Sequence, residues 1–354
     1  MEKPLYKVPS MREISALPWN GYNVVSTFSG CGGSCLGYRM AGYRVLWASE
    51  FIPAAQATYK ANHPNSILDT RDIRQVQPED ILTATGMGVG DIDILDGSPP
   101  CAAFSTTGKR EKGWGTVKKY SDSKQRVDDL FFEYTRILKG LQPKVFVAEN
   151  VSGLVKGTAK GYFIEILKTL KSCGYRVKCK LLDAQWLGVP QMRQRTIFVG
   201  VREDLGLEPV HPKPIAYQYF VRDAISDITK DDSDRYILPE GKIKLLYLNT
   251  KDCEKGRFED AHIRLFGKSS AFNHARAVWD LPSRTILQGS QSVYHPEEAR
   301  TFSINELKRI CAFPDDFILK GTFTQQWERL GRAVPPVMMM HIAKTIQLRI
   351  LDLL

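Results

Sequence analysis

Apolar runs and segments of helical periodicity alternate along the first two hundred residues. The short apolar runs predict strands at 23–28, 44–50, 91–97, 144–151, 175–184 and 195–202. Apolar residues at helical spacing predict helices at 53–63, 128–141 and 162–175. Strands that alternate with helices are typical of a mainly parallel sheet covered by helices on both faces. The pattern therefore predicts an α/β fold.

The alternation ends near residue 203 and gives way to a polar, turn-rich segment. Basic residues are scattered there among short apolar patches: Lys242, Lys244, Lys251, Lys255, Arg257, Arg264 and Lys268. A helical pattern returns at 302–313, and 335–354 predicts a closing helix with proline near its start. We expect a small second domain at 203–283 and a large domain made of 1–202 and 284–354.

Four chemically distinctive side chains stand at the ends of predicted strands. Phe28 and Glu50 close the first two strands, Cys101 follows the third, and Glu149 stands near the end of the fourth. Ligands of open α/β sheets bind at the carboxyl ends of the strands. The spacing therefore predicts one shared site for these residues.

Composition and charge narrow the class of protein. The 354 residues are 43% hydrophobic and 25% charged, as in a soluble globular protein, and no apolar stretch is long enough to cross a bilayer. The first residues lack the apolar segment of a secretory signal, so we expect a cytoplasmic protein. The formal net charge of +10 favours a polyanionic partner, although a basic surface alone also fits an ordinary enzyme.

Seven cysteines, an odd number, do not form a disulfide framework, and reduced thiols fit better. Cys31 and Cys35 have no second pair of ligands nearby, so we expect no metal site.

Glycines follow the first predicted strand in "FSGCGG", where backbone can approach a nucleotide-like ligand. The run is not the dinucleotide fingerprint G-x-G-x-x-G, which argues against a nicotinamide dehydrogenase. Glu50 is placed to accept hydrogen bonds from ribose hydroxyls, and Asp72 offers a second carboxylate. A strand–helix turn and a solvated aspartate are the plainer interpretations of the glycines and of Asp72.

Two prolines stand directly before a cysteine in "GSPPC". Proline fixes its own φ and restricts the residue before it, so Ser98, Pro99 and Pro100 have few conformations. A rigid approach suits a thiol that must be placed before a reaction begins. It also suits an ordinary turn with a buried cysteine.

Six short blocks together resemble the C5-cytosine DNA methyltransferases of bacteria and their viruses, over nearly the whole chain. The blocks, in the family's order, are "FSGCGG" (28–33), "GSPPC" (97–101), "ENV" (149–151), "QMRQR" (191–195), "SRTI" (283–286) and "GRAVPP" (331–336). The resemblance implies a Rossmann-like, S-adenosylmethionine-dependent methyltransferase fold with a small target-recognition domain at 203–283. It also implies a function in DNA methylation, either within a restriction-modification system or as an enzyme that acts alone.

The resemblance implies a catalytic role for four residues. Cys101 is the expected nucleophile, attacking C6 of a cytosine flipped out of duplex DNA. Glu149 is expected to hold the base through N3 and the exocyclic amine, and Arg193 and Arg195 to contact the base and the catalytic groups.

The same resemblance implies an S-adenosyl-L-methionine pocket that releases S-adenosyl-L-homocysteine. Its expected residues are Phe28, Gly30, Gly33, Glu50, Phe51, Asp72, Ile73, Pro100, Leu130, Ala333 and Val334. For Phe51, Ile73 and Leu130, core packing is a serious rival interpretation.

Residues 105–124, which follow Cys101, carry six basic and two acidic side chains and predict a glycine-containing loop over bound DNA. The expected DNA contacts are Ser105, Lys109, Arg110, Lys118 and Lys119. A solvated surface loop is the alternative.

One block departs from the family. The late block usually reads Gly-Asn-Ala-Val, whereas this chain has Arg332 in place of the asparagine. Arginine accepts no hydrogen bond, which puts that contact in doubt.

Two other functions remain open. A tRNA cytosine-C5 methyltransferase of the same family would carry Cys-Phe-Thr in the recognition region, but Glu254 follows Cys253. A non-catalytic DNA-binding regulator would lack the cysteine or the glutamate. We expect a monomer that binds double-stranded DNA, with a cognate restriction endonuclease as a separate protein and no membrane partner.

Overall fold

The computed structural model describes residues 3–100, 118–120, 123–125, 130–155, 160–228, 236–251, 255–269, 273–289 and 291–354. Within these residues the chain divides into two compact units. The sheet unit comprises Arg12–Asp183, Gln194–Lys213 and Met338–Leu354. The accessory unit comprises Met1–Met11, Ala184–Arg193 and Pro214–Val337. The assignment of 203–283 as a separate recognition domain stays a prediction.

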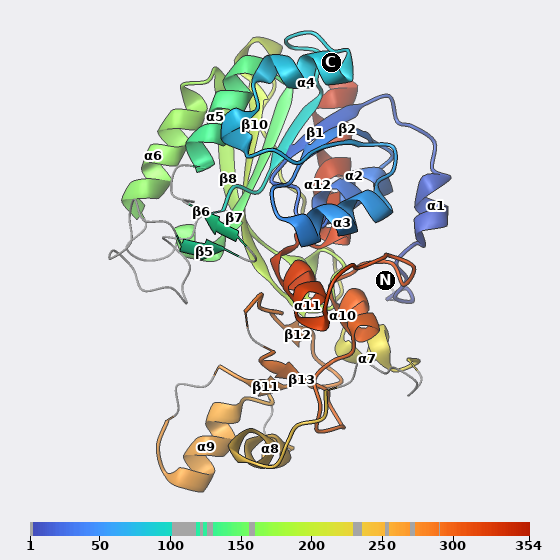
Figure 1. The fold of residues 1–354 in the computed structure, drawn as a ribbon, viewed down its shortest axis with the longest axis vertical. Helices are drawn as coiled ribbons and strands as arrows, with labels where there is room; N and C mark the ends of the chain where they lie inside the picture. The colour runs from blue at the N-terminus through green and yellow to red at the C-terminus, as the bar shows by residue number, and fades with distance from the viewer. Residues whose placement is uncertain are drawn as a thin grey trace. The chain divides into compact units, whose positions relative to one another are not determined.

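A seven-stranded sheet forms the centre of the sheet unit, in the order β3-β2-β1-β4-β7-β10-β8 (Figure 1). The strands are β1 (Asn23–Thr27), β2 (Arg44–Ser49), β3 (Ile67–Asp69), β4 (Ile94–Gly97), β7 (Val145–Val151), β8 (Tyr175–Asp183) and β10 (Gln194–Arg202). The pairs from β3 to β7 are parallel, whereas β10 is antiparallel to both β7 and β8. The predicted mainly parallel α/β sheet is confirmed.

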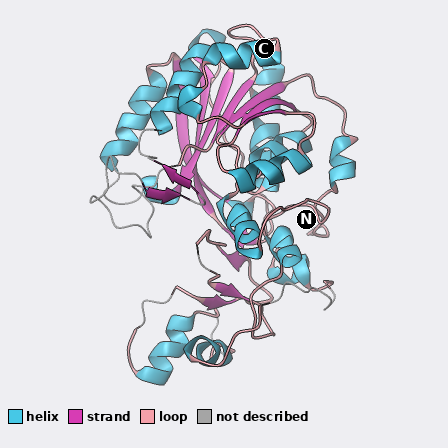
Figure 2. Ribbon diagram, in the orientation of Figure 1, coloured by secondary structure: helices cyan, strands magenta, loops and turns pink. Residues whose placement is uncertain are grey.

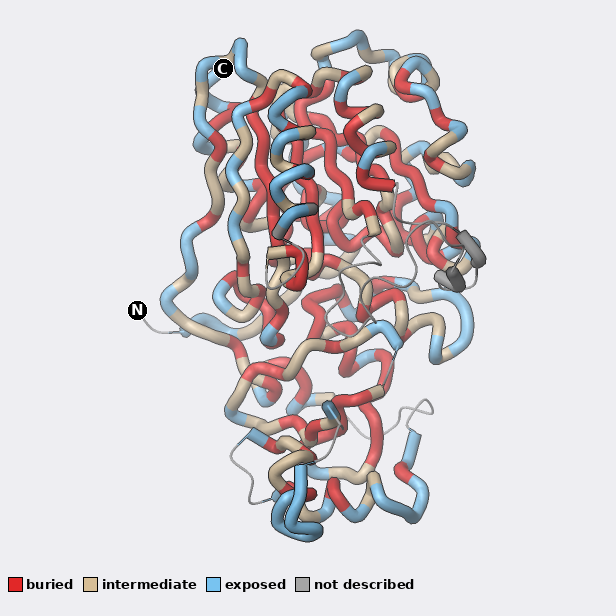
Figure 3. The backbone as a smooth tube through the Cα atoms, turned by 90° about the vertical axis from the view of Figure 1, so that its left-hand side faces the viewer, coloured by how far each residue is buried: buried red, intermediate tan, exposed pale blue. Residues whose placement is uncertain are grey.

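Burial along the strands follows their place in the sheet. All five residues of β1 are buried, as expected for a central strand with helices on both faces. Strand β8 alternates between more and less exposed residues, because it lies at the edge. Figure 3 shows the buried strands as red tubes.

Helices cover both faces of this sheet (Figure 2). The helices of this part of the chain are α1 (Met11–Ser15), α2 (Gly33–Met40), α3 (Pro53–Asn62), α4 (Pro78–Thr85), α5 (Leu130–Leu141), α6 (Lys160–Lys171) and α12 (Pro336–Arg349). The apolar sides of α4, α5 and α6 pack on the strands in a core that includes Leu95, Ile137, Phe146 and Phe198. The same core includes Ile73 and Leu130.

The accessory unit is built from short elements. Its strands are β9 (Gln191–Met192), β11 (Ala275–Arg276), β12 (Ser283–Arg284) and β13 (Val293–Tyr294). Its helices are α7 (Val221–Ile225), α8 (Lys242–Leu248), α9 (Phe258–Phe266), α10 (Ile304–Ile310) and α11 (Phe323–Arg332). A small core with Tyr247, Phe258 and Tyr294 packs between α8, α9 and β13.

A buried ion pair holds the start of α10 in the accessory unit. Arg300 donates two hydrogen bonds of 2.8 Å to the carboxylate of Glu306, which is 1% exposed. Glu306 also completes a capping box with Ser303.

The predicted loop at 105–124 ends in a small hairpin. Strands β5 (Lys118–Tyr120) and β6 (Ser123–Gln125) pair antiparallel. These residues are mostly polar and lack the alternation of apolar side chains that signals a strand, so the prediction missed the hairpin.

No helix in the described part of the chain is long and apolar enough to span a bilayer.

Candidate active site

The sheet unit brings several predicted site residues to one edge. Phe28 directly follows β1, Glu50 follows β2, and Glu149 lies near the carboxyl end of β7. Arg195 lies at the start of β10, and this strand runs antiparallel to β7, so that its amino end meets the carboxyl ends of the others. The antiparallel direction of β10 is therefore what places an arginine beside the glutamate.

Glu149 and Arg195 form an ion pair at this edge. Arg195 Nε lies 2.7 Å from Glu149 Oε1, and the two side chains are 13% and 10% exposed, the arginine first. The register pairs Ile197 with Glu149 and Val151 with Arg195, so the two charged residues are diagonal neighbours on one face. Burial lowers the pKa of Arg195, and the charge of Glu149 acts in the opposite direction.

This pair fixes the direction of the carboxylate. Taking two charges out of water carries a desolvation penalty that close pairing offsets. Because about a tenth of each side chain stays exposed, the pair can still be reached from outside. The arrangement can hold and polarise a polar ring that presents both a donor and an acceptor.

Asn150, the residue after Glu149, ties β7 to the proline turn. Its Nδ2 donates to the carbonyl oxygen of Pro99 at 3.4 Å, and its Oδ1 accepts from the backbone N–H of Val151 at 2.9 Å. The side chain is 3% exposed. Sequence reasoning missed this residue as a positioning group, although it stands inside the block "ENV".

Four of the predicted site residues lie outside the described part of the chain: Cys101, Ser105, Lys109 and Arg110. Lys118 and Lys119 are described as backbone of β5 only. The roles of all six stay predictions.

The glycine loop wraps around Glu50. The backbone N–H of Gly30 donates to Oε2 of Glu50 at 2.7 Å, and the N–H of Ile52 donates to Oε1 at 2.6 Å. Phe28 adopts a left-handed φ of 54°, a conformation that a bulky side chain rarely takes outside functional turns. A Cβ at Gly30 would meet open space, so the loop leaves room beside the carboxylate.

These features fit a nucleoside-like group. Glu50 presents an oriented carboxylate for ribose hydroxyls, and Phe51 is 38% exposed, so that its ring is available for stacking. Gly33 is the first residue of α2, whose N-terminus follows the loop.

The other residues predicted for this pocket differ in their burial and in their partners. Asp72 pairs with Arg74 at 2.9 Å and accepts from its backbone N–H at 3.0 Å. Ile73 and Leu130 are buried in the main core, at 5% and 3% exposure, and Pro100 is half-buried. Core packing accounts for the burial of Ile73 and Leu130, whether or not their edges also line a pocket.

A buried acid, Asp96, lies beneath the same edge in β4. It accepts hydrogen bonds from Ser26 Oγ at 3.0 Å and from Tyr38 Oη at 3.3 Å. Burial, aided by the charge of Glu149, raises the pKa of Asp96 to about 7, although the hydrogen bonds from Ser26 and Tyr38 act in the opposite direction. Sequence reasoning treated Asp96 as the end of a strand and gave it no role.

Arg193 organises the accessory unit. It is 1% exposed and donates to the carbonyl oxygens of Ile286, at 3.1 Å, and Gly331, at 2.7 Å. Three blocks of the sequence pattern therefore meet at one guanidinium. A Cβ at Gly331 would come within 2.8 Å of the Leu287 backbone, which explains why glycine stands there. This geometry gives Arg193 a positioning role, and its contact with a base stays a prediction.

The late block lies at the end of α11. Arg332, which departs from the family pattern, pairs with Glu328 at 2.8 Å. Ala333 leaves the helix in an extended conformation, and Val334 is 4% exposed.

The comparisons with known proteins agree with the block pattern. The model of the C-5 cytosine-specific DNA methylase family matches residues 22–348. The chain belongs to this family. It is a DNA (cytosine-5-)-methyltransferase.

Two curated relatives illustrate the match. The enzyme is 30% identical over 361 residues to the type II methyltransferase M.NgoPII of Neisseria gonorrhoeae. The alignment covers 95% of this chain and 98% of that protein. It is 32% identical over 331 residues to the type II methyltransferase M1.HphI of Haemophilus parahaemolyticus, with 91% and 86% covered.

Solved structures share the fold. A protein encoded within an E. coli prophage superposes with a TM-score of 0.69 at 22% identity, covering 93% of this chain and 99% of that one. The S. pombe Dnmt2 methyltransferase superposes with a TM-score of 0.61 at 16% identity, covering 94% and 99%. At these identities the likeness shows the fold alone.

Proposed function

We propose that the enzyme methylates C5 of a cytosine within a short, specific sequence of duplex DNA, with S-adenosylmethionine as methyl donor. The observation that carries the proposal is the ion pair of Glu149 with Arg195 at the edge where the "GSPPC" segment begins. The names of the curated relatives support duplex DNA of a restriction-modification system as the substrate.

The proposed reaction starts with the base outside the stack. C6 of a paired cytosine is enclosed by its neighbours, so the base must be flipped out before a protein group can reach it. Glu149, oriented by Arg195, then accepts a hydrogen bond from the exocyclic amine through one carboxyl oxygen and shares a proton with N3 through the other. In a site that excludes water, such contacts stabilise the charge that develops on the ring.

Cys101 supplies the proposed nucleophile as a thiolate. A sulfur–C6 bond forms, and the electron pair of the 5,6 double bond passes to C5. Bound S-adenosylmethionine would supply the methyl group to C5 and leave as S-adenosylhomocysteine, its sulfur keeping the electron pair of the broken S–CH3 bond. Loss of the C5 proton then restores the double bond, breaks the sulfur–C6 bond and returns the thiolate.

In this scheme the two prolines position the sulfur atom of Cys101. Pro99 and Pro100 limit the backbone before Cys101, and Asn150 holds the Pro99 carbonyl from β7. The same strand thus carries the residue that holds the base and the residue that anchors the approach to the nucleophile.

Glu50, Phe51 and the backbone around Gly30 are the proposed cofactor contacts. The carboxylate, held by two backbone N–H groups, is placed for the ribose hydroxyls, and the exposed ring of Phe51 for the adenine.

We propose that residues 203–283 read the bases around the target and that the basic residues after Cys101 contact phosphates. We further propose that the enzyme works as a monomer in the cytoplasm of a bacterium or of a phage-infected host, beside a separate restriction endonuclease.

Transfer of labelled methyl groups tests the proposal. Wild-type enzyme should label mixed-sequence duplex DNA, and Glu149→Gln should lose at least about 100-fold in kcat. Labelling of tRNA without labelling of duplex DNA would contradict the proposed substrate and favour the tRNA-modifying alternative.

A further inference from the structure

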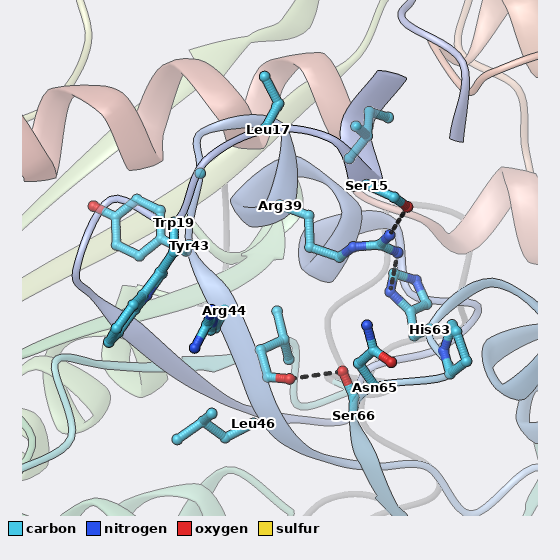
Figure 4. Close-up of a pocket in the computed structure, with 14 residues that line it drawn as sticks. Ser15, Leu17, Trp19, Arg39, Tyr43, Arg44, Leu46, His63, Asn65 and Ser66 are labelled. Carbon is cyan, nitrogen blue, oxygen red and sulfur yellow. Dashed lines mark hydrogen bonds between the residues drawn. The ribbon is translucent and has the colours of Figure 1, made fainter. Parts of the chain in front are cut away.

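The sheet unit contains a pocket at the end of β2 opposite to Glu50. The pocket has a volume of about 290 Å³ and lies between the end of α2, the loop after α3, and the segment around α1 (Figure 4). Arg44, which lines it, is the first residue of β2, and Glu50 follows the last. Six strand residues span roughly 17 Å, so this pocket is distinct from the candidate active site.

Two arginines give the pocket its charge. Arg39 and Arg44 line it, and none of the residues that line it, all of which the structure describes, is acidic. Within the described part of the chain, neither arginine has an ion-pair partner. His63 adds no charge at physiological pH, because burial and the neighbouring Arg39 lower its pKa to about 3.

Arg39 is held in place with part of its donor capacity unused. Nη1 donates to the carbonyl of Asn62 at 2.7 Å and lies 3.2 Å from His63 Nδ1, and Nη2 donates to Ser15 Oγ at 3.0 Å. A guanidinium has five N–H donors. Two of them, including that on Nε, have no acceptor among the described residues. Figure 4 shows this guanidinium between Ser15 and His63.

Arg44 is held differently. Its Cζ lies 4.3 Å from the centre of the Trp19 ring, and both residues line the pocket. Stacking on an aromatic ring orients a guanidinium while its edges remain available to an anion. Asn65, an exposed residue on the loop after α3, adds an amide group to the same lining.

We propose that this pocket binds the phosphate group of a small phosphorylated molecule or of free inorganic phosphate. Two guanidinium groups without a carboxylate nearby match the charge of a phosphate dianion, and their N–H groups can donate to its oxygens in pairs. The volume lies at the small end for ligand sites, which suits a phosphate with a compact substituent. The proposal does not depend on the proposed methyl-transfer mechanism.

Calorimetric titration tests the proposal on the full chain without DNA or cofactor. Inorganic phosphate, added at constant ionic strength against a chloride control, should bind saturably with a Kd below about 1 mM. Arg44→Gln should weaken this binding about tenfold, because one charged contact is lost. Arg44 makes no hydrogen bond that the fold needs, whereas Arg39 does, so Arg44 is the variant of choice.

Arg349→Gln is the matched control. Arg349, in the last turn of α12, is also exposed and belongs to the same unit, so its loss removes the same charge elsewhere. This variant should bind phosphate like the wild type.

Ribose 5-phosphate distinguishes the two sources of the phosphate group. Tighter binding than inorganic phosphate, with the same dependence on Arg44, indicates a phosphate ester, and weaker binding indicates the free ion. Absence of saturable binding to the wild type would overturn the proposal. So would equal binding by Arg44→Gln and Arg349→Gln, or displacement of phosphate by a short duplex DNA.

Discussion

Arg195 Nε lies 2.7 Å from Glu149 Oε1, across two neighbouring antiparallel strands of the sheet. The relationship depends on the register, which places the two side chains diagonally on one face. An arginine at this point orients the carboxylate in a mostly buried setting. The pair is the centre of the proposed base-holding site.

The planar shape of the Arg195 guanidinium, and not only its positive charge, should be needed for full kcat. Arg195→Lys keeps the positive charge but loses the planar fork, so the carboxylate of Glu149 is held less firmly. We expect kcat to fall about 100-fold while the Kd of S-adenosylmethionine stays within about twofold. Single-turnover methyl transfer and cofactor titration measure the two quantities. A Lys variant with wild-type kcat would mean that the pair does not orient the base.

Asn150 should affect the chemical step through the proline turn. Asn150→Ala removes the donor to Pro99 and leaves that carbonyl without this bond, which should cost about 1–2 kcal/mol of stability. Because the next segment leads to Cys101, we expect a kcat loss of about tenfold or more with little change in DNA affinity. Thr135→Val, which removes a partly buried hydrogen bond to the carbonyl of Phe132 in the same unit, is the control and should retain kcat.

Gly32, in the glycine loop, leaves no room for a side chain. Gly32 has a φ of +90°, and a Cβ there would lie 2.2 Å from His63 Nε2. Gly32→Ala should therefore destabilise the protein by about 3 kcal/mol, measured by urea unfolding. Gly86→Ala, at a φ of +68° with open space around it, should cost only about 1 kcal/mol. Equal losses for the two variants would show that the loop moves aside to admit the methyl group.

Arg193 should be essential for the stability of the accessory unit. Arg193→Met leaves the buried carbonyls of Ile286 and Gly331 without their donor, and we expect a loss of about 3 kcal/mol. Arg332→Met breaks a partly exposed ion pair with Glu328 and should stay within about 1 kcal/mol. Chemical unfolding that ranks the two variants in the opposite order would refute the positioning role.

The raised pKa of Asp96 should make the free energy of unfolding depend on pH. Its folded pKa of about 7 lies above the ordinary value of 3.8, so the folded state holds this proton more firmly than the unfolded state does. The resulting stability is fully present below about pH 4 and is lost as the pH rises through 7. Asp96→Asn should remove this decline, which is on the order of 4 kcal/mol. Urea unfolding between pH 4.5 and 8 compares the two slopes, and parallel slopes would contradict the assignment.

The strands and their ends could be predicted because apolar runs between helical segments give a strong signal. Helix α2 was missed, since Gly33, Ser34 and Gly37 interrupt its apolar pattern in a glycine-rich run. Helix α4 was missed although Pro78 begins it. The direction of β10 could not be read from its sequence, because apolar alternation does not distinguish parallel from antiparallel pairing.

Prediction of the site was limited in a similar way. Residues with distinctive chemistry, such as Glu149, were found from motifs, whereas Asn150 and Asp96 act through hydrogen bonds that only the folded backbone creates. The bases read by 203–283 could not be predicted, because readout depends on which side chains reach a groove.

The central claim is that the Cys101 thiolate bonds to C6 of a flipped cytosine, and duplex DNA with 5-fluorocytosine at the target position tests it most directly. Fluorine at C5 cannot leave as a proton does, so the adduct should accumulate only when S-adenosylmethionine is present. Mass spectrometry of the digested complex should place the nucleotide on the peptide that contains Cys101, and Cys101→Ala should give no adduct. Full methyl transfer by Cys101→Ala, or an adduct on another residue, would contradict the account.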